Sequence, residues 1–366
     1  MSFNCGIVGL PNVGKSTLFN ALTQTAAAQA ANFPFCTIEP NVGKVAVPDE
    51  RLKKVAEIAS SAKVIPAQLE FVDIAGLVKG ASKGEGLGNQ FLANIRETDA
   101  IVHVVRCFED SDITHVDGSI DPIRDAETIE SELMIADLES IERQIKNVER
   151  KAKSGDKDSK AQMDILSRYK EALDELKPAS SVELTDDEKA LAKTFGMLSA
   201  KPILYVCNVS EDDAATGNEL TKRVEAMAAE KGAEAVIVSA AIEAEIAQLD
   251  SEEDKKELLE SMGLEEPGLN KIIRAGYSLL GLRNYFTAGP KEARAWTINV
   301  GDKAPRAAGK IHSDFERGFI RAETIAYDDF ISFKGEQGAK EAGKMRQEGK
   351  EYVVQDGDII LFRQNT

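Results

Sequence analysis

The sequence has little of what secreted, membrane and zinc-binding proteins contain. Its 366 residues include only four cysteines, with no Cys-x-x-Cys pair, and only three histidines. Neither a disulfide framework nor a zinc site is therefore indicated. No apolar run approaches the ~18 residues of a membrane span, and the first residues lack the basic start of a signal peptide. We therefore expect a cytoplasmic protein without membrane contact.

Positive charge is also scarce. Lys and Arg number 45 against 62 Asp and Glu, which gives a formal net charge of -17. A non-specific nucleic-acid binder neutralises phosphates with basic side chains, so the composition excludes that class. The deficit is uneven, because residues 283–366 sum to +1 and the rest of the chain to -18. A contact with RNA through this locally basic tail stays open.

A phosphate-binding loop is present near the N-terminus. Residues 9–16 fit G-x-x-x-x-G-K-[ST] at every fixed position, between an apolar run at 4–8 and a helical pattern. Lys15 is expected to bind the β and γ phosphates of a nucleotide, and the Ser16 hydroxyl to bind Mg²⁺. Backbone N–H groups are expected to surround the phosphates; they belong to Asn12, Val13, Gly14, Lys15, Ser16 and Thr17.

Two further residues are candidates for the metal. Thr37 follows the phosphate loop at the interval of the first switch of GTPases, although a single loop threonine is a weak signal. Asp73 ends an apolar run and begins D-x-x-G, an element that supports Mg²⁺ through water; the alternative is a helix cap. Residues 76–88 contain five glycines, which predicts a flexible second switch or an ordinary mobile loop.

The base-recognition motif departs from that of GTPases. After the apolar strand at 203–207 comes Asn208-Val209-Ser210-Glu211, where GTPases have Asn-Lys-x-Asp. The longer Glu211 cannot place its carboxylate where the aspartate binds guanine, and each unpaired buried donor costs ~1–3 kcal/mol. The motif therefore predicts loss of guanine selectivity and permits ATP. Ser239, which follows a strand at 235–238, is expected to complete the base pocket.

The residue that positions the attacking water is less clear. Leu77 stands where Ras-type enzymes have glutamine, and leucine cannot hydrogen-bond to water. His115 lies in the loop that leaves the strand at 100–105, at the edge where phosphates bind, and is our candidate. A plain surface histidine is the alternative. His103 lies within that strand and is expected to be structural.

A helical segment interrupts the nucleotide motifs. Apolar residues at 134–152 alternate steps of four and three, a charged break follows at 153–156, and helical spacing resumes at 166–176. This predicts an antiparallel helical hairpin inserted at about 126–200, rather than two surface helices packed on the body. The tail, 283–366, is predicted to be a small mixed domain; its strand candidates are 295–300, 325–327, 351–354 and 359–362.

The whole chain resembles the YchF subfamily of Obg-like ATPases. The resemblance rests on residues 9–16, 32–41, 73–89 and 208–211, the last being a non-guanine motif typical of that family. Its members have an apolar residue at the position of Leu77. Stretches 308–315 and 335–349 resemble the family's TGS domain, a β-grasp fold similar to ubiquitin. We therefore expect an α/β nucleotide-binding domain at 1–282, with the helical insert, and a TGS domain at 283–366.

The resemblance also implies a function. Such proteins are cytosolic ATPases that associate with ribosomes, prefer ATP to GTP and are linked to translation and stress responses. We expect a monomer that uses Mg²⁺ and ATP and contacts the ribosome, with rRNA or tRNA bound through the TGS domain and the hairpin. Two alternatives remain: a GTPase that tolerates Glu211, and a nucleotide-gated ribosome- or RNA-binding module with negligible turnover.

Overall fold

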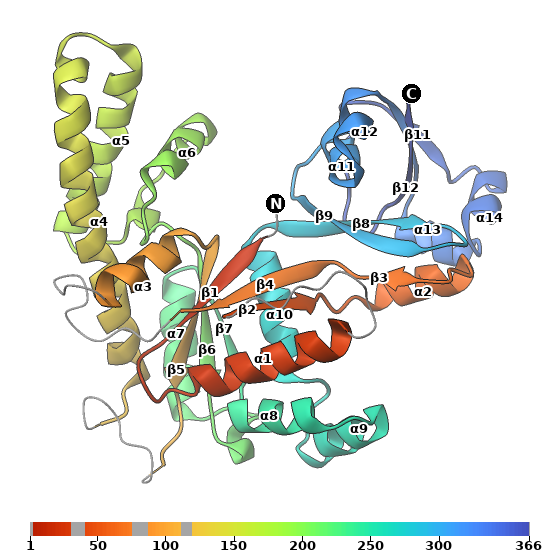
Figure 1. The fold of residues 1–366 in the computed structure, drawn as a ribbon, viewed down its shortest axis with the longest axis horizontal. Coiled ribbons are helices and arrows are strands. Elements are labelled where there is room, and N and C mark those ends of the chain that lie inside the picture. The colour runs from red at the N-terminus through yellow and green to blue at the C-terminus, as the bar shows by residue number, and fades with distance from the viewer. Residues whose placement is uncertain (1–2, 31–40, 75–86, 111–118, 366) are drawn as a thin grey trace.

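The computed structural model describes residues 3–30, 41–74, 87–110 and 119–365. Their strands form two six-stranded sheets (Figure 1). In this part of the chain, no helix combines the length and apolar character that a membrane crossing requires.

The first sheet belongs to the nucleotide-binding region. Its order is β2-β4-β1-β5-β6-β7, and all neighbours are parallel except β2 and β4. The strands are β1 (Asn4–Val8), β2 (Val42–Ala46), β4 (Gln68–Asp73), β5 (Ala100–Arg106), β6 (Ile203–Asn208) and β7 (Glu234–Val238). Because the parallel strands end at one edge, the residues that follow them meet there. The strands predicted from apolar runs are confirmed.

Helices cover both faces of this sheet. Along β6, Leu204 and Val206 pack into one apolar cluster and Tyr205 and Cys207 into another, as alternation in a strand requires. All seven residues of β5 are buried. The covering helices are α1 (Lys15–Ala30), α3 (Leu87–Arg96), α7 (Glu219–Glu230), α8 (Ala240–Gln248), α9 (Glu252–Ser261) and α10 (Gly268–Leu279).

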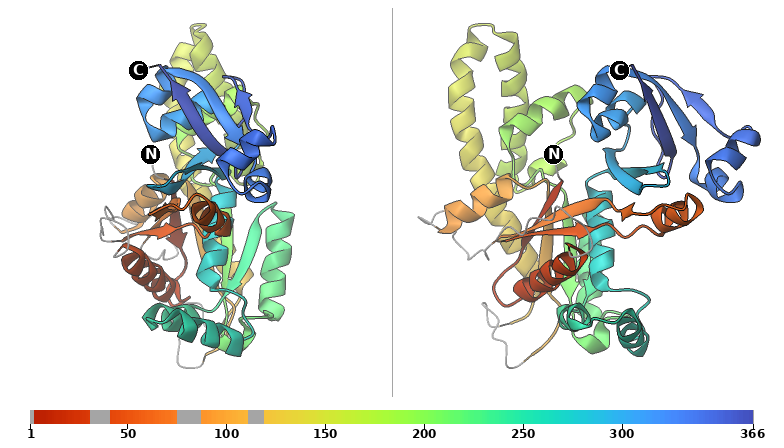
Figure 2. Two further views of the ribbon diagram at one scale, coloured as in Figure 1. Left: turned by 90° about the vertical axis from the view of Figure 1, so that its right-hand side faces the viewer. Right: turned by 45° about the vertical axis from the view of Figure 1, so that its right-hand side comes forward.

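The predicted antiparallel hairpin is confirmed. It consists of α4 (Pro122–Lys153) and α5 (Lys157–Asp174), and it projects from the first sheet (Figures 1 and 2). The first arm is longer than the 19 residues predicted, because α4 begins at Pro122 behind the N-cap Asp121 and spans 32 residues. The chain returns through three short helices: η1 (Ala179–Ser181), α6 (Asp186–Ala192) and η2 (Lys193–Phe195).

The second sheet has the order β11-β10-β12-β8-β9-β3. Its strands are β3 (Val64–Ile65), β8 (Leu282–Ala288), β9 (Ala293–Asn299), β10 (Phe319–Ile325), β11 (Arg346–Glu348) and β12 (Ile359–Gln364). Parallel strands β8 and β12 lie at its centre, and α11 (Ala304–Ile311) packs on one face, which is the β-grasp arrangement. The remaining helices are α12 (Ser313–Arg317), α13 (Tyr327–Ser332) and α14 (Glu336–Glu341).

Two strand predictions in the tail are wrong. Residues 351–354 form only an isolated bridge, between Val353 and Lys303, and the strand lies earlier at β11. The predicted strand at 325–327 covers only the end of β10, since α13 begins at Tyr327. Short polar strands such as β11, with two of three residues exposed, show no apolar run by which a sequence pattern can find them.

An arm from the first part of the chain joins the second sheet. It comprises α2 (Glu50–Ile58) and β3, and β3 pairs in parallel with β9. Arg51 on this arm forms ion pairs with Asp49 at 2.9 Å and with Asp356 at 2.8 Å, and its guanidinium lies 5.5 Å from the centre of the Phe286 ring. The second sheet is thus completed by residues from the N-terminal part of the sequence.

Candidate functional site

The phosphate loop lies between β1 and α1, at the carboxyl edge of the first sheet. Gly14 has φ +90, and a Cβ there would stand 2.1 Å from the Asn208 amide nitrogen. A Cβ on Gly9 would stand 2.9 Å from the Val104 carbonyl oxygen. Glycine is therefore required at both positions, because neighbouring strands approach the loop too closely for a side chain.

The loop brings two predicted residues into direct contact. The Lys15 ammonium forms a short ion pair with the Asp73 carboxylate, and its side chain is only 9% exposed. Asp73 ends β4, the neighbour of β1. Ser16 and Thr17 lie beside this pair at the start of α1 and are exposed.

These residues fit a magnesium ion that is bound together with phosphate. The Ser16 hydroxyl and the Asp73 carboxylate are oxygen donors, the type that Mg²⁺ prefers. Within the described residues, no group of three or more His, Cys, Asp and Glu side chains converges as a metal site. A magnesium ion here therefore needs phosphate oxygens or water as further ligands. Thr37 lies outside the described residues.

Asn208 connects the phosphate loop to the base-recognition motif. Its amide nitrogen donates to the Val13 carbonyl oxygen at 2.9 Å, and its side-chain oxygen accepts from the Ala240 N–H at 2.9 Å. The side chain is buried, and both of its polar ends are bonded. Asn208 thus fixes the distance between the phosphate loop and the start of α8. The sequence places residues 239–241 at the base pocket but does not predict this bond to Ala240, since a backbone partner leaves no mark in the sequence.

The other base-motif residues occupy different environments. Val209 is 3% exposed, its side chain packs in the cluster beside β6, and its N–H donates to Val238 O at 2.9 Å. Glu211 is exposed and begins η3 (Glu211–Asp213). Ser239 is buried at the N-cap position of α8, and its hydroxyl forms no hydrogen bond with any described residue. A buried hydroxyl of this kind is suited to bind an atom of a ligand.

Of the histidines, His103 is buried in β5 as expected. Burial lowers the pKa of His103 from 6.5 to about 4, and its Nδ1 atom has no hydrogen-bond partner in the part of the chain that the structure describes, so the ring is neutral at pH 7. It lies against Tyr205, with ring centroids 5.8 Å apart. His115 and Leu77 both lie outside the described residues.

Comparison with known proteins identifies the family. Residues 4–137 match the model of the 50S ribosome-binding GTPase family, and residues 282–365 match YchF-GTPase_C, described as a protein of unknown function (DUF933). A protein of Haemophilus ducreyi named ribosome-binding ATPase YchF is 61% identical, with all of both chains covered. The chain belongs to the YchF family.

Further relatives agree with this assignment. The Bacillus subtilis protein of the same name is 59% identical, with both chains fully covered. A solved structure of the Schizosaccharomyces pombe YchF GTPase has a TM-score of 0.89 and 40% identity, covering 99% of this chain and 98% of that one. The YchF fold therefore extends over both sheets and the helical hairpin. The names of these relatives differ on the nucleotide, ATPase for the bacterial proteins and GTPase for the Schizosaccharomyces pombe protein.

Proposed function

We propose that this YchF-family protein is a ribosome-associated, Mg²⁺-dependent ATPase that prefers ATP to GTP and acts in translation or stress regulation. The observation that carries the proposal is the altered base motif beside an intact phosphate loop. Asn208 ties the two together, while Val209 and Glu211 occupy the positions at which a GTPase recognises guanine. The names of the relatives agree with an ATPase that binds ribosomes.

In this proposal, the phosphate loop orients the triphosphate. The N–H groups at the start of α1 bind phosphate oxygens, and Lys15 exchanges part of its contact with Asp73 for the β and γ phosphates. Ser16 and Thr37 would ligate Mg²⁺, and Asp73 would support it through water. The bound ion supplies a positive charge that stabilises negative charge developing on the transferred phosphoryl group.

In this proposal, the pocket selects ATP because it lacks the lysine and the aspartate by which GTPases recognise guanine. Val209 is buried, so its side chain cannot lie along the base as a lysine stem would. Glu211 cannot pair with guanine as aspartate does, so GTP would leave donors unpaired. The Ser239 hydroxyl and backbone carbonyls near Val209 remain to bind adenine. Restoring the missing aspartate should therefore weaken the preference for ATP.

A substitution at Glu211 tests this base argument. Glu211→Asp should raise GTP affinity relative to ATP by about tenfold, because about 1.4 kcal/mol of hydrogen bonding becomes available to guanine. Glu219→Asp, an equal shortening on the exposed first turn of α7, is the matched control. Calorimetric titrations with both nucleotides give the ratio. An unchanged ratio in Glu211→Asp would refute the role given to this residue.

Turnover needs a group that positions water, and Leu77 cannot serve. We propose His115 for this role. His115→Ala should then lower the single-turnover rate with unchanged ATP affinity. Full turnover in this variant would exclude the histidine.

Two alternatives have specific support. The Schizosaccharomyces pombe relative is called a GTPase, which favours a GTPase that tolerates Glu211. Leu77 favours a nucleotide-gated binding module with negligible turnover. Single-turnover hydrolysis with and without ribosomes separates enzyme from module: an uncatalysed rate under both conditions would favour the module.

The partner and domain assignments are part of the same proposal. We divide the chain into a nucleotide-binding domain at 1–282, with the insert at about 126–200, and a TGS domain at 283–366. The hairpin and the TGS domain would contact the ribosome, including rRNA or tRNA, in a cytoplasmic protein that acts as a monomer. Co-sedimentation with ribosomes in ATP, in ADP and without nucleotide tests this. Equal sedimentation in all three states would contradict a nucleotide switch.

A further inference from the structure

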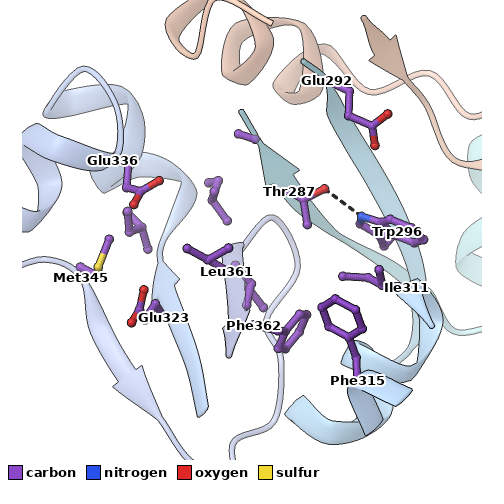
Figure 3. Close-up of a pocket in the computed structure, with 14 residues that line it drawn as sticks. Thr287, Glu292, Trp296, Ile311, Phe315, Glu323, Glu336, Met345, Leu361 and Phe362 are labelled. Atoms are coloured by element: carbon purple, nitrogen blue, oxygen red, sulfur yellow. Dashed lines mark hydrogen bonds between the residues drawn. The ribbon is translucent and has the colours of Figure 1, made fainter. Parts of the chain in front are cut away.

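The centre of the second sheet contains a cavity. Strands β8 and β12 pair only at Phe286 and Ile359, where the Phe286 N–H donates to the Asp358 carbonyl oxygen at 2.8 Å. Both strands continue beyond this point, but no further residues of the two pair with each other. A cavity of about 240 Å³ is lined by residues from both strands, including Thr287 and Leu361 (Figure 3).

Aromatic and aliphatic side chains form most of the cavity wall. The Trp296 indole N–H donates to the Thr287 hydroxyl at 2.9 Å, which fixes the ring (Figure 3). Arg294 lies outside the lining, with its guanidinium 4.4 Å from the ring centre. The other large apolar lining residues are Ile311, Phe315, Ile325, Met345, Ile359, Ile360, Leu361 and Phe362. Because these come from strands and helices of one fold, the wall is formed before any ligand arrives.

The charged residues that line the cavity are all acidic. Glu323 is bound by Arg363 at 2.9 Å and by Arg321 at 3.1 Å, and these partners lower its pKa. Glu292 and Glu336 form no ion pair with a described residue, although the charge of Arg363 also acts on Glu336. Negative charge at the cavity therefore comes chiefly from these two carboxylates, and it repels phosphate-bearing ligands.

The strand edges beside the cavity offer hydrogen-bonding groups. In an antiparallel ladder, the N–H and C=O of successive residues point alternately to the two neighbouring strands. The Phe286 N–H points toward β12, so the backbone groups of Ala288 also point toward the gap. The same alternation directs the backbone of Phe362 toward β8. An extended chain can bond to such edges, as in strand addition.

The volume of the cavity restricts its occupant. Pockets for whole small molecules measure about 300–1,000 Å³, so 240 Å³ suits one or two side chains of a peptide. A lysine or arginine side chain suits this lining. Its stem packs on the aromatic rings of the wall, and its charged end reaches one of the lining carboxylates.

We propose that this cavity binds an extended segment of a partner protein that carries a basic side chain. Trp296 and Phe315 contact the stem of that side chain, and its charge binds one of the two carboxylates, Glu292 or Glu336, which lie at opposite ends of the lining (Figure 3). The edges of β8 and β12 bond to the segment's backbone. This interaction is separate from nucleotide binding, and no residue of the phosphate loop takes part in it.

The single tryptophan of the chain, Trp296, provides a direct measurement. The full chain is titrated with a nine-residue peptide that alternates arginine and valine while tryptophan fluorescence is recorded. We expect a saturable change. The double variant Glu292→Gln, Glu336→Gln should bind about tenfold more weakly, since the charge-assisted contact is lost whichever carboxylate makes it. The double variant Glu257→Gln, Glu265→Gln changes net charge equally at exposed positions elsewhere and should bind normally.

Several outcomes would overturn the proposal. A matched peptide with glutamate in place of arginine should give no saturable change; if it binds as well, the carboxylates do not select the ligand. Equally weakened peptide binding in both double variants would show that binding depends only on the overall net charge of the protein. A nine-nucleotide oligouridylate that competes for the cavity would assign it to RNA. The absence of any saturable change with the basic peptide would also contradict the proposal. Circular dichroism of each variant confirms that it is folded.

Discussion

The two sheets differ in how their central strands are paired and covered. In the first sheet, β5 pairs with β1 over four residues and with β6 over six, and every residue of β5 is buried. In the second, β8 and β12 pair at one position, and Leu361 of β12 is 41% exposed. The first sheet can therefore offer a ligand only its carboxyl edge, whereas the second also offers a cavity between strands.

The largest predicted difference between the two sheets is the loss of unfolding free energy when one large side chain in each is truncated. Phe71 on β4 is 0% exposed, so Phe71→Ala should lower the free energy of unfolding by about 3–5 kcal/mol. Leu361→Ala should cost less than about 1 kcal/mol, because that side chain is already partly in water. Urea unfolding of both variants measures the two values. Similar losses would show that the second sheet is packed as tightly as the first.

A buried histidine makes the first sheet sensitive to acid. The pKa of His103 is about 4 in the folded chain and 6.5 when it is unfolded, so between these values the unfolded chain binds the additional proton. Stability is then fully present above pH 6.5 and falls as the pH drops toward 4, by about 3 kcal/mol. His103→Phe should remove this part of the pH dependence in urea unfolding. The exposed control His312→Gln should retain it; the same pH profile in all three proteins would contradict the assignment.

The phosphate loop should be sensitive to one added methyl group. Gly14→Ala combines a positive φ with a clash against Asn208, so we expect about 2 kcal/mol lower stability and at least tenfold weaker ATP binding. Gly155→Ala in the hairpin turn is the matched control: its φ is +99, but nothing lies within 4 Å of the added Cβ. It should lose about 1 kcal/mol and keep normal ATP affinity. Equal effects on ATP binding would remove the specific role given to Gly14.

The same contrast between the sheets explains which features the sequence predicts. Strands buried on both faces, such as β5 and β6, are continuous apolar runs, and the phosphate loop is a contiguous motif, so the sequence predicts both. The apolar repeat likewise predicts the helical hairpin, but it does not predict the start of α4 at Pro122, because that first turn packs on the body and does not follow the repeat.

Features that depend on distant residues could not be predicted in this way. The bond from Asn208 to Ala240 and the ion pair between Lys15 and Asp73 arise only when separate strands end at one edge. The pairing of β3 with β9 joins residues more than 200 positions apart. The cavity forms where β8 and β12 stop pairing, and no local sequence pattern predicts where two strands stop pairing. The spacing of apolar residues predicts which face of one helix or strand is buried. These features depend instead on contacts between different helices and strands.

The central claim is that the altered base motif selects ATP. The most direct measurement is equilibrium binding of ATP and GTP to the unmodified chain in the presence of Mg²⁺. We predict that ATP binds at least tenfold more tightly, since guanine would lose at least one buried hydrogen bond beside Glu211. Equal affinities, or tighter binding of GTP, would contradict the account.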